Sequence, residues 1–272
     1  MNNTDTGTSD RTGPATALLL LHGFPLDHRM WDDVIRALAT DLQVLAPDLP
    51  GLGGADVPDG EPSVDRSADQ VAALVEAAGH ERVVVAGLSM GGYVALALAE
   101  RHPGLVAGLA LVDTKSTADE EAARANRERV ADEVESSGSV EAVLGMVGSL
   151  LSDESVRGRP DLPSIVTAWI GEQQPAGIAW SQRAMAARPD RSDVLADVDG
   201  PVVVVVGEDD TITPLAAAQH MASTARDAEL VTVPGAGHLS ALEAPGPVAA
   251  ALDRLLRRAA EATPTSPESS TS

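Results

Sequence analysis

The chain has 272 residues, a formal net charge of −22, 44% hydrophobic residues and no cysteine. This acidity, with no basic patch to offset it, argues against binding to nucleic acid or to an acidic partner. The lack of cysteine excludes disulfides, thiolate metal sites and a cysteine nucleophile. No apolar run reaches the roughly 18 residues of a membrane helix, and residues 1–13 do not resemble a secretory signal. We therefore expect a cytoplasmic protein that does not bind membranes.

Along the chain, short apolar runs alternate with stretches of helical periodicity. Continuous apolar runs, flanked by turn residues, predict strands that are buried on both faces. Helical spacing of apolar residues predicts amphipathic helices between them. The predicted strands are 17–21, 44–46, 83–86, 109–112, 202–206 and 229–233, and the predicted helices include 31–38, 63–79, a stretch ending near 102, one after Pro214, and one near 248–256. This alternation predicts an α/β fold with a mainly parallel sheet that helices cover on both faces.

The strand pattern stops from about residue 114 to residue 188, and Ala, Glu and Arg dominate 119–136. Helices are expected there at about 119–136, 143–151 and 165–170. We interpret 114–188 as a helical cap inserted between two core segments, 15–113 and 189–260. The polar ends, 1–14 and 261–272, are expected to be disordered tails.

The sequence Gly-Leu-Ser-Met-Gly at residues 87–91 lies between a β-branched run and an Ala- and Leu-rich helical stretch. In this context, Gly-x-Ser-x-Gly is typical of a nucleophile elbow, a sharp strand-to-helix turn that exposes the serine hydroxyl. Gly87 and Gly91 fit this reading, because side chains there would collide with the neighbouring backbone. Ser89 is thus the candidate nucleophile.

A serine hydroxyl needs a base to take its proton, and the base is usually a histidine oriented by a carboxylate. His238 is the best candidate, because it follows the last strand on the turn Pro-Gly-Ala-Gly-His. The carboxylate is expected on the turn after 202–206, which offers Glu208, Asp209 and Asp210, with Asp113 as a rival at another strand end. The other histidines are expected at helix ends (His80, His102, His220), in the first loop (His28), or bracing that loop (His22).

Together, the motifs at residues 22–25, 48–51, 87–91, 207–210 and 237–238 resemble those of the α/β-hydrolase superfamily. Within it, the chain is most similar to the 3-oxoadipate enol-lactonase, carboxylesterase and cofactor-free haloperoxidase-like group. The resemblance covers roughly residues 15–260, and the order Ser, Asp, His is that of the superfamily. It implies an α/β-hydrolase fold with Asp210 as the acid, and an oxyanion hole formed by the backbone N–H groups of Phe24 and Met90.

Two departures from the family pattern are visible. No antiparallel hairpin precedes the strand at 17–21, so about six strands are expected. The loop Pro-Gly-His-Gly of the family reads Pro-Gly-Leu-Gly at residues 50–53.

The leading hypothesis is a serine hydrolase that cleaves small carboxylic esters or lactones through an acyl-enzyme on Ser89. One alternative is perhydrolysis, with haloperoxidase-like activity, at the same triad, and another is a ligand-binding receptor without turnover. No histidine pair has metal-ligand spacing on a helix, so no metal is expected. The stretch at residues 50–54 lacks the third glycine of a dinucleotide-binding motif, and no cofactor is expected. Apolar residues that are candidates for lining a substrate pocket are Trp31, Met146 and Trp169, with Trp180 and Met185 as further cap candidates.

Overall fold

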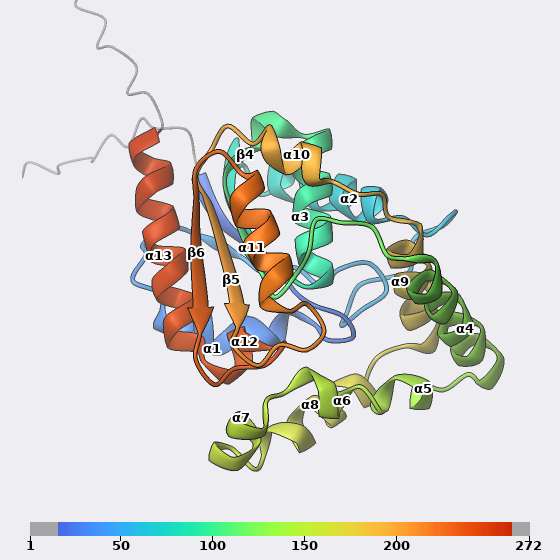
Figure 1. Cartoon of the computed structure of the whole chain (residues 1–272). Coiled ribbons are helices and arrows are strands. Elements are labelled where there is room, and N and C mark those ends of the chain that lie inside the picture. Colours follow the sequence, from blue (N-terminus) through green and yellow to red (C-terminus); the bar gives the residue numbers. More distant parts are fainter. Residues whose placement is uncertain (1–15, 263–272) are drawn as a thin grey trace, which may run out of the picture.

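The computed structural model describes residues 16–262 (Figure 1). The predicted disorder of 1–14 and of 263–272 therefore falls on residues outside the described range. The last helix continues through residues 261 and 262, so the prediction of disorder at these two residues is wrong.

Six parallel strands form one sheet in the order β2-β1-β3-β4-β5-β6. The strands are β1 (Thr16–Leu21), β2 (Val44–Leu45), β3 (Arg82–Leu88), β4 (Val106–Val112), β5 (Val202–Gly207) and β6 (Ala228–Val233). The prediction of a mainly parallel sheet of about six strands is confirmed. Strand β5, a run of five valines and a glycine, is buried along its whole length, as expected for a strand covered on both faces.

Helices cover the sheet in two layers (Figure 1). One layer holds α1 (Asp32–Ala37) and α13 (Pro245–Ala262). The other holds α2 (Val64–Ala77), α3 (Met90–Arg101), α10 (Ser192–Ala196) and α11 (Leu215–Thr224). Short helices complete this part of the chain: η1 (His28–Trp31), η2 (Pro103–Leu105) and α12 (Ser240–Glu243). Helix α2 begins as predicted, because the hydroxyl of Ser63 accepts a hydrogen bond from the N–H of Asp65 at 3.1 Å.

The order of the strands reverses at β1, which has β2 on one side and β3 on the other. In open parallel sheets, ligands bind beyond the carboxyl ends of the strands at such a switch point. The loops that follow β1 and β3 are therefore neighbours, and these are the two loops that carry Phe24 and Ser89.

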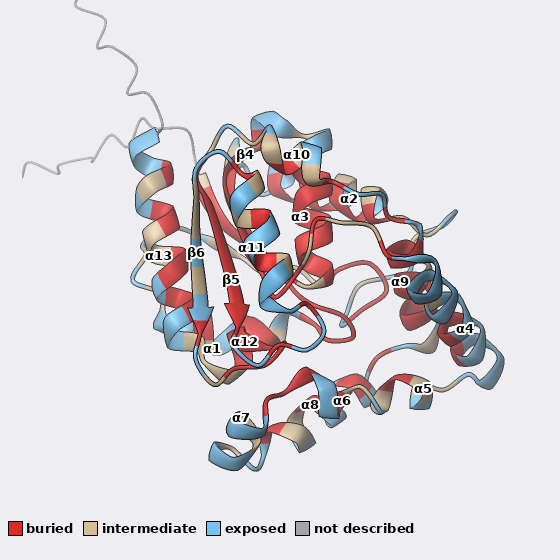
Figure 2. Ribbon diagram, in the orientation of Figure 1, coloured by how far each residue is buried: buried red, intermediate tan, exposed pale blue. Residues whose placement is uncertain are grey.

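The segment predicted to be a cap, 114–188, contains six helices, which we refer to as the helical insertion. They are α4 (Glu121–Ser137), α5 (Glu141–Leu144), α6 (Val147–Leu150), α7 (Asp153–Gly158), α8 (Leu162–Gly171) and α9 (Pro175–Ala187). The insertion extends beyond the arrowheads of β5 and β6, and α4 packs against α9 with its outer face exposed (Figures 1 and 2).

Two details of the sequence prediction are wrong. The helix expected at 143–151 is split into α5 and α6, and residue Gly145 lies at the break. Glycine disfavours helix interiors because it loses the most backbone freedom on folding. His220 lies inside α11 rather than at its end.

None of the helices in residues 16–262 is long and apolar enough to cross a membrane.

Candidate active site

Ser89 lies alone in the turn between β3 and α3, with φ 51° and ψ −111°. A non-glycine residue with this backbone conformation is strained, and such strain is typical of functional sites. The flanking glycines allow the turn. A Cβ on Gly87 would lie 2.2 Å from the carbonyl oxygen of Gly91, and one on Gly91 would lie 2.1 Å from that of Leu21. The steric reason given for both glycines from the sequence therefore holds.

The end of β4 holds this turn in place. The N–H of Ser89 donates to the carbonyl of Val112 at 2.9 Å. The hydroxyl of Thr114 donates to the carbonyl of Ser89 at 2.7 Å. The strained serine is thus bonded on both sides to the neighbouring strand.

Three of the predicted site residues form a continuous hydrogen-bonded chain. The Oγ of Ser89 lies 2.9 Å from Nε2 of His238, and Nδ1 of His238 lies 2.9 Å from Oδ2 of Asp210. The side chains of His238 and Asp210 are 2% and 0% exposed. Although burial opposes it, hydrogen bonds from His238 and Thr213 hold the pKa of Asp210 below its ordinary value. Asp210 is thus an ionised acceptor, suited to orient the imidazole.

The other acids considered from the sequence do not bond to His238. Glu208 and Asp209 are exposed on the same turn. Asp113 is buried, but its carboxylate bonds to Gly207 and Ser240.

Thr213 belongs to this site and was missed by the sequence analysis. Its hydroxyl donates to Oδ2 of Asp210 at 2.7 Å and lies 3.3 Å from Nδ1 of His238. The N–H groups of Ile212 and Thr213 donate to Oδ1 of Asp210 at 2.8 and 3.0 Å. An aspartate side chain that accepts hydrogen bonds from the N–H groups two and three residues later forms a local turn motif. The spacing Asp-x-x-Thr was therefore the sequence signal that could have identified Thr213.

The loop after β1 approaches the nucleophile. A Cβ on Gly23 would lie 3.5 Å from the Cβ of Ser89, so Phe24 follows a residue in contact range of the serine. Phe24 is buried beside a cis Phe24–Pro25 bond. As the first residue of α3, Met90 has an N–H group that the helix cannot satisfy internally. Both amides thus belong to segments next to Ser89.

His22 braces this loop, as the sequence analysis expected. The N–H of Leu49 donates to its Nε2 at 2.7 Å, and its Nδ1 lies 3.1 Å from the carbonyl of Gly23. Burial lowers the pKa of His22, which keeps the imidazole neutral and able to accept.

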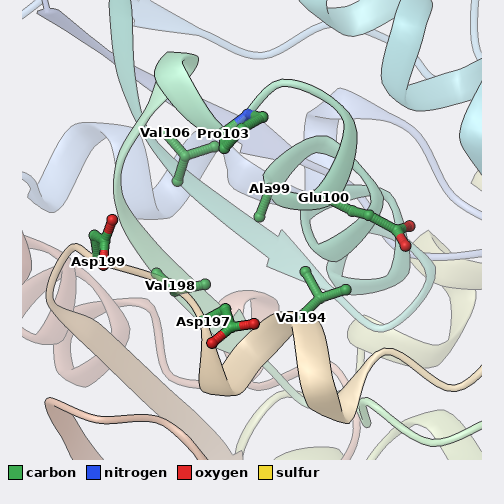
Figure 3. Close-up of a pocket in the computed structure, with 8 residues that line it drawn as sticks. All are labelled: Ala99, Glu100, Pro103, Val106, Val194, Asp197, Val198 and Asp199. Atoms are coloured by element: carbon green, nitrogen blue, oxygen red, sulfur yellow. The ribbon is translucent and has the colours of Figure 1, made fainter.

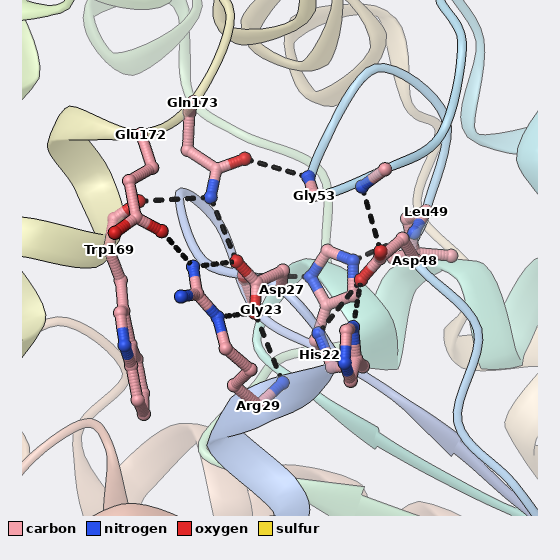
Figure 4. A network of polar contacts seen from close by, with 12 residues as sticks. His22, Gly23, Asp27, Arg29, Asp48, Leu49, Gly53, Trp169, Glu172 and Gln173 are labelled. Atoms are coloured by element: carbon pink, nitrogen blue, oxygen red, sulfur yellow. Dashed lines mark hydrogen bonds and ion pairs between the residues drawn. The ribbon is translucent and has the colours of Figure 1, made fainter.

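A polar network joins the same loop to the helical insertion (Figure 4). The side-chain amide of Gln173 donates to Oδ2 of Asp27 at 3.0 Å, and its oxygen accepts from the N–H of Gly53 at 2.8 Å. Arg29 binds both oxygens of Asp27 at 2.8 and 2.7 Å and also pairs with Glu172 at 2.7 Å. Gln173 and Glu172 follow α8, so the insertion is bonded directly to the loop that carries Phe24.

Within this network, Asp27, His28 and Asp48 lie close enough to share a metal ion. The Asp27 carboxylate is already bound by Arg29 and Gln173, while Asp48 accepts from His28 and Gly54. Because protein donors occupy these carboxylates, we assign no metal to the cluster.

The residues suggested as a pocket lining have different surroundings. Trp31 has no exposed surface and packs in the core, so it does not line a space that is open to solvent. Trp169 and Met146 are half-buried on the insertion, and the guanidinium of Arg29 lies 5.1 Å from the Trp169 ring centre. The further candidates Trp180 and Met185 are buried.

A separate cavity of about 290 Å³ lies between the end of α3 and the segment around α10 (Figure 3). None of the predicted site residues lines it. Its lining residues are Ala99, Glu100, Pro103, Val106, Val194, Asp197, Val198 and Asp199.

The comparisons with known proteins agree with this architecture. Residues 16–245 match the family described as alpha/beta hydrolase fold, and the chain belongs to this family. It is 31% identical over 233 residues to the pimeloyl-[acyl-carrier protein] methyl ester esterase of Neisseria meningitidis, an alignment that covers 80% of this chain and 85% of that protein.

Solved structures are similar over nearly the whole chain. A thermophilic esterase from Thermogutta terrifontis, solved with malate bound, superposes with a TM-score of 0.86 at 36% identity, covering 91% of this chain and 92% of that one. The enol-lactonase from Burkholderia xenovorans superposes with a TM-score of 0.80 over 91% of this chain and 94% of that one, but at 22% identity it shows the fold alone. The predictions of an α/β-hydrolase fold and of an ester-hydrolysing enzyme are confirmed.

Proposed function

We propose that this chain hydrolyses small carboxylic esters or lactones through an acyl-enzyme on Ser89. The observation that carries the proposal is the hydrogen-bonded chain Ser89–His238–Asp210, with 2.9 Å between the bonding atoms at each step. These distances are those that a nucleophile, its general base and the group that orients the base require.

In this proposal, Oγ of Ser89 attacks the substrate carbonyl while Nε2 of His238 takes the serine proton. The N–H groups of Phe24 and Met90 stabilise the oxyanion that forms. His238 then donates its proton to the alkoxide oxygen as the ester bond breaks. The alcohol of an ester departs, whereas that of a lactone stays attached to the acyl group on Ser89. A water molecule, deprotonated by His238, attacks the acyl-enzyme. His238 then passes this proton to Oγ of Ser89 as the acyl–oxygen bond breaks and the carboxylic acid leaves, and Asp210 remains ionised throughout.

The helical insertion is proposed to act as the cap over this site, with Trp169 and Met146 as candidate pocket residues. Its polar bonds to the Phe24 loop support that role. The net charge of −22 disfavours the approach of anionic substrates, so uncharged acyl groups are the proposed preference. The esterase relatives support the reaction class and leave the acyl group open.

The test is covalent labelling with a fluorophosphonate probe, followed by mass spectrometry of the labelled peptide. Labelling is expected on Ser89 and should be lost in Ser89→Ala. The matched control, Ser223→Ala, changes an exposed serine on α11 and should label like the parent chain. A panel of neutral and anionic p-nitrophenyl esters and lactones then ranks the acyl groups.

Other outcomes would point to the alternative functions. Saturable ligand binding with no labelling and no turnover on any ester or lactone would refute hydrolysis and favour a receptor. Labelling of Ser89 with peroxide-dependent halide oxidation in the presence of a carboxylic acid would show perhydrolysis at the same triad.

A further inference from the structure

Asp113 is a fully buried carboxyl group that the proposed reaction does not use. It follows the last residue of β4, and its φ of 44° lies in the left-handed region, which aspartate tolerates better than most residues. Its Oδ1 accepts from the N–H of Gly207 at 2.8 Å. Its Oδ2 accepts from the N–H and the hydroxyl of Ser240 at 3.0 and 2.6 Å. Three donors from two distant segments therefore meet on one side chain.

The first of these segments is the turn that carries Asp210. Val112 pairs with Val205 across the parallel ladder, and the N–H of Asp113 still donates to the carbonyl of Val205 at 2.9 Å. In a regular parallel ladder, the N–H of Gly207 would next meet a backbone carbonyl of β4. It meets the carboxylate of Asp113 instead. The side chain thus fixes the last residue of β5, from which the turn to Asp210 starts.

The second segment carries His238. Ser240 follows His238 by two positions and begins α12, and both its N–H and its hydroxyl are bound to Asp113. The two turns also touch each other directly, because a Cβ on Gly207 would lie 2.1 Å from the carbonyl oxygen of Gly237. A shift of either turn would therefore break a bond to the same carboxylate.

The residues on either side of Asp113 hold the third component, the turn of Ser89, through the carbonyl of Val112 and the hydroxyl of Thr114. We infer that Asp113 is a positioning residue of the active site. Its carboxylate fixes the turn of Asp210 relative to the turn of His238, at the same strand end that holds the turn of Ser89. This inference rests on the proposed function of the triad and adds a residue to it.

The charge of Asp113 also acts on the site. Burial raises the pKa of Asp113 to about 7. The charge of His238 and the hydrogen bonds from Ser240 and Gly207 oppose this rise, whereas the nearby Asp210 carboxylate reinforces it. His238 and Asp210 are the titratable groups that act on it, while Gly207 and Ser240 are neutral. An ionised Asp113 favours the protonated imidazolium of His238 during the reaction, beyond what Asp210 alone provides.

The experiment compares Asp113→Asn and Ser240→Ala with the parent chain in steady-state kinetics over pH 5–9. Asp113→Asn removes the charge and places an amide NH₂ against the donors of Gly207 or Ser240. As a result, kcat should fall about 10- to 100-fold, while KM should change less than about twofold. The acidic limb of the kcat/KM profile should move to lower pH by several tenths of a unit, because protonation of the base loses a favourable charge. Ser240→Ala removes one of the three bonds, and kcat should fall about threefold.

The matched control is Asp209→Asn, which removes an exposed charge from the turn of Asp210 and should leave kcat and the pH profile unchanged. If Asp209→Asn moves the acidic limb as far as Asp113→Asn does, the effect is one of general charge and the inference fails. It fails also if Asp113→Asn has the parent kcat and profile. If Asp113→Asn does not fold, an unchanged kcat in Ser240→Ala overturns the inference. Fluorophosphonate labelling distinguishes a failure of the proposed function from a failure of this inference. An unlabelled parent chain refutes the proposed function. Equal labelling rates in the parent chain and Asp113→Asn refute only the positioning role of Asp113.

Discussion

Asp119 is the centre of a buried ion cluster that ties the two ends of the helical insertion together, and its removal gives a sharp stability prediction. It precedes α4, while Arg188 follows α9. The guanidinium of Arg188 binds both oxygens of Asp119 at 2.8 and 2.9 Å and lies 3.8 Å from the ring centre of Tyr93 on α3. Arg127 and Lys115 bind the same carboxylate at 2.6 and 2.8 Å.

The expected magnitude follows from burial. The side chains of Asp119 and Arg188 are each 2% exposed, whereas those of Arg127 and Lys115 are 22% and 26% exposed and can regain water. Asp119→Asn therefore leaves one guanidinium buried without its counter-charge. A charge pair about 4 Å apart at an effective dielectric constant of about 20 is worth roughly 4 kcal/mol. Breaking a buried pair by removing one partner costs about 3–5 kcal/mol. We expect the free energy of unfolding to fall by about 4 kcal/mol.

The assay is urea denaturation at pH 7, with Asp197→Asn as the matched control. Asp197 pairs with Arg226 through side chains that are 77% and 60% exposed, so its substitution should change stability by no more than about 0.5 kcal/mol. A loss below about 1 kcal/mol in Asp119→Asn would refute the reasoning, and so would a loss no larger than that of the control.

The same substitution carries a pH dependence of known sign. Against the effect of burial, bonds from Arg188 and the charge of Arg127 hold the pKa of Asp119 far below its ordinary range. A depressed folded-state pKa means that the stabilisation is complete above the unfolded value of about 4 and is lost as the pH falls further. The stability difference between the parent chain and Asp119→Asn should therefore stay constant from pH 7 to about 5 and shrink only as the pH is lowered below about 4.

Three further predictions concern the site and its frame. Asp210→Asn should lower kcat by about 10³- to 10⁴-fold in ester hydrolysis, because His238 loses the group that orients it. Asp209→Asn, on the same turn, should keep a kcat near the parent value. The reverse result would show that Asp209 is the acid of the triad. Gln173→Ala should lower kcat about 10-fold, since it removes the bond that braces the Phe24 loop through Asp27 and a second bond to Gly53 on the loop after β2. An unchanged kcat would show that the Phe24 loop needs no support from the insertion. Gly91→Ala should abolish soluble expression or lower the melting temperature strongly, because the new Cβ would lie 2.1 Å from a backbone oxygen of β1. Gly104→Ala is the control and should be tolerated, because the space around Gly104 is open.

The sheet and the turn of Ser89 were predictable because their determinants are local. Buried parallel strands appear as continuous apolar runs, and β5 is one of them. The elbow combines a strand, a helix and two close-approach glycines within residues 83–101, so it could be recognised in one stretch of sequence. Choosing the acid was harder, because Glu208, Asp209 and Asp210 follow the same strand and local sequence does not rank them. The family resemblance favoured Asp210, and the structure brings that residue to His238.

What the sequence did not reveal are bonds between residues far apart in the chain. Asp113 lies 94 positions from Gly207 and 127 positions from Ser240. Gln173 lies 146 positions from Asp27. No periodicity or motif links such positions, since their contact depends on how the strands are ordered and where the insertion lies. The fragmentation of the helix predicted at 143–151 shows the complementary limit, because apolar content alone did not reveal the break at Gly145.

The bonds of Gln173 to Asp27 and Gly53 have a consequence for how selectivity and rate can vary in this enzyme. Gln173 belongs to the insertion, which is proposed to act as the cap, and its bond to Asp27 anchors it on the loop that is proposed to bind the oxyanion. Substitutions in α8 that widen the pocket would therefore also be transmitted to the catalytic machinery. Engineering of this chain for bulkier esters should keep residues 172–173 fixed and diversify α5 and α6 instead.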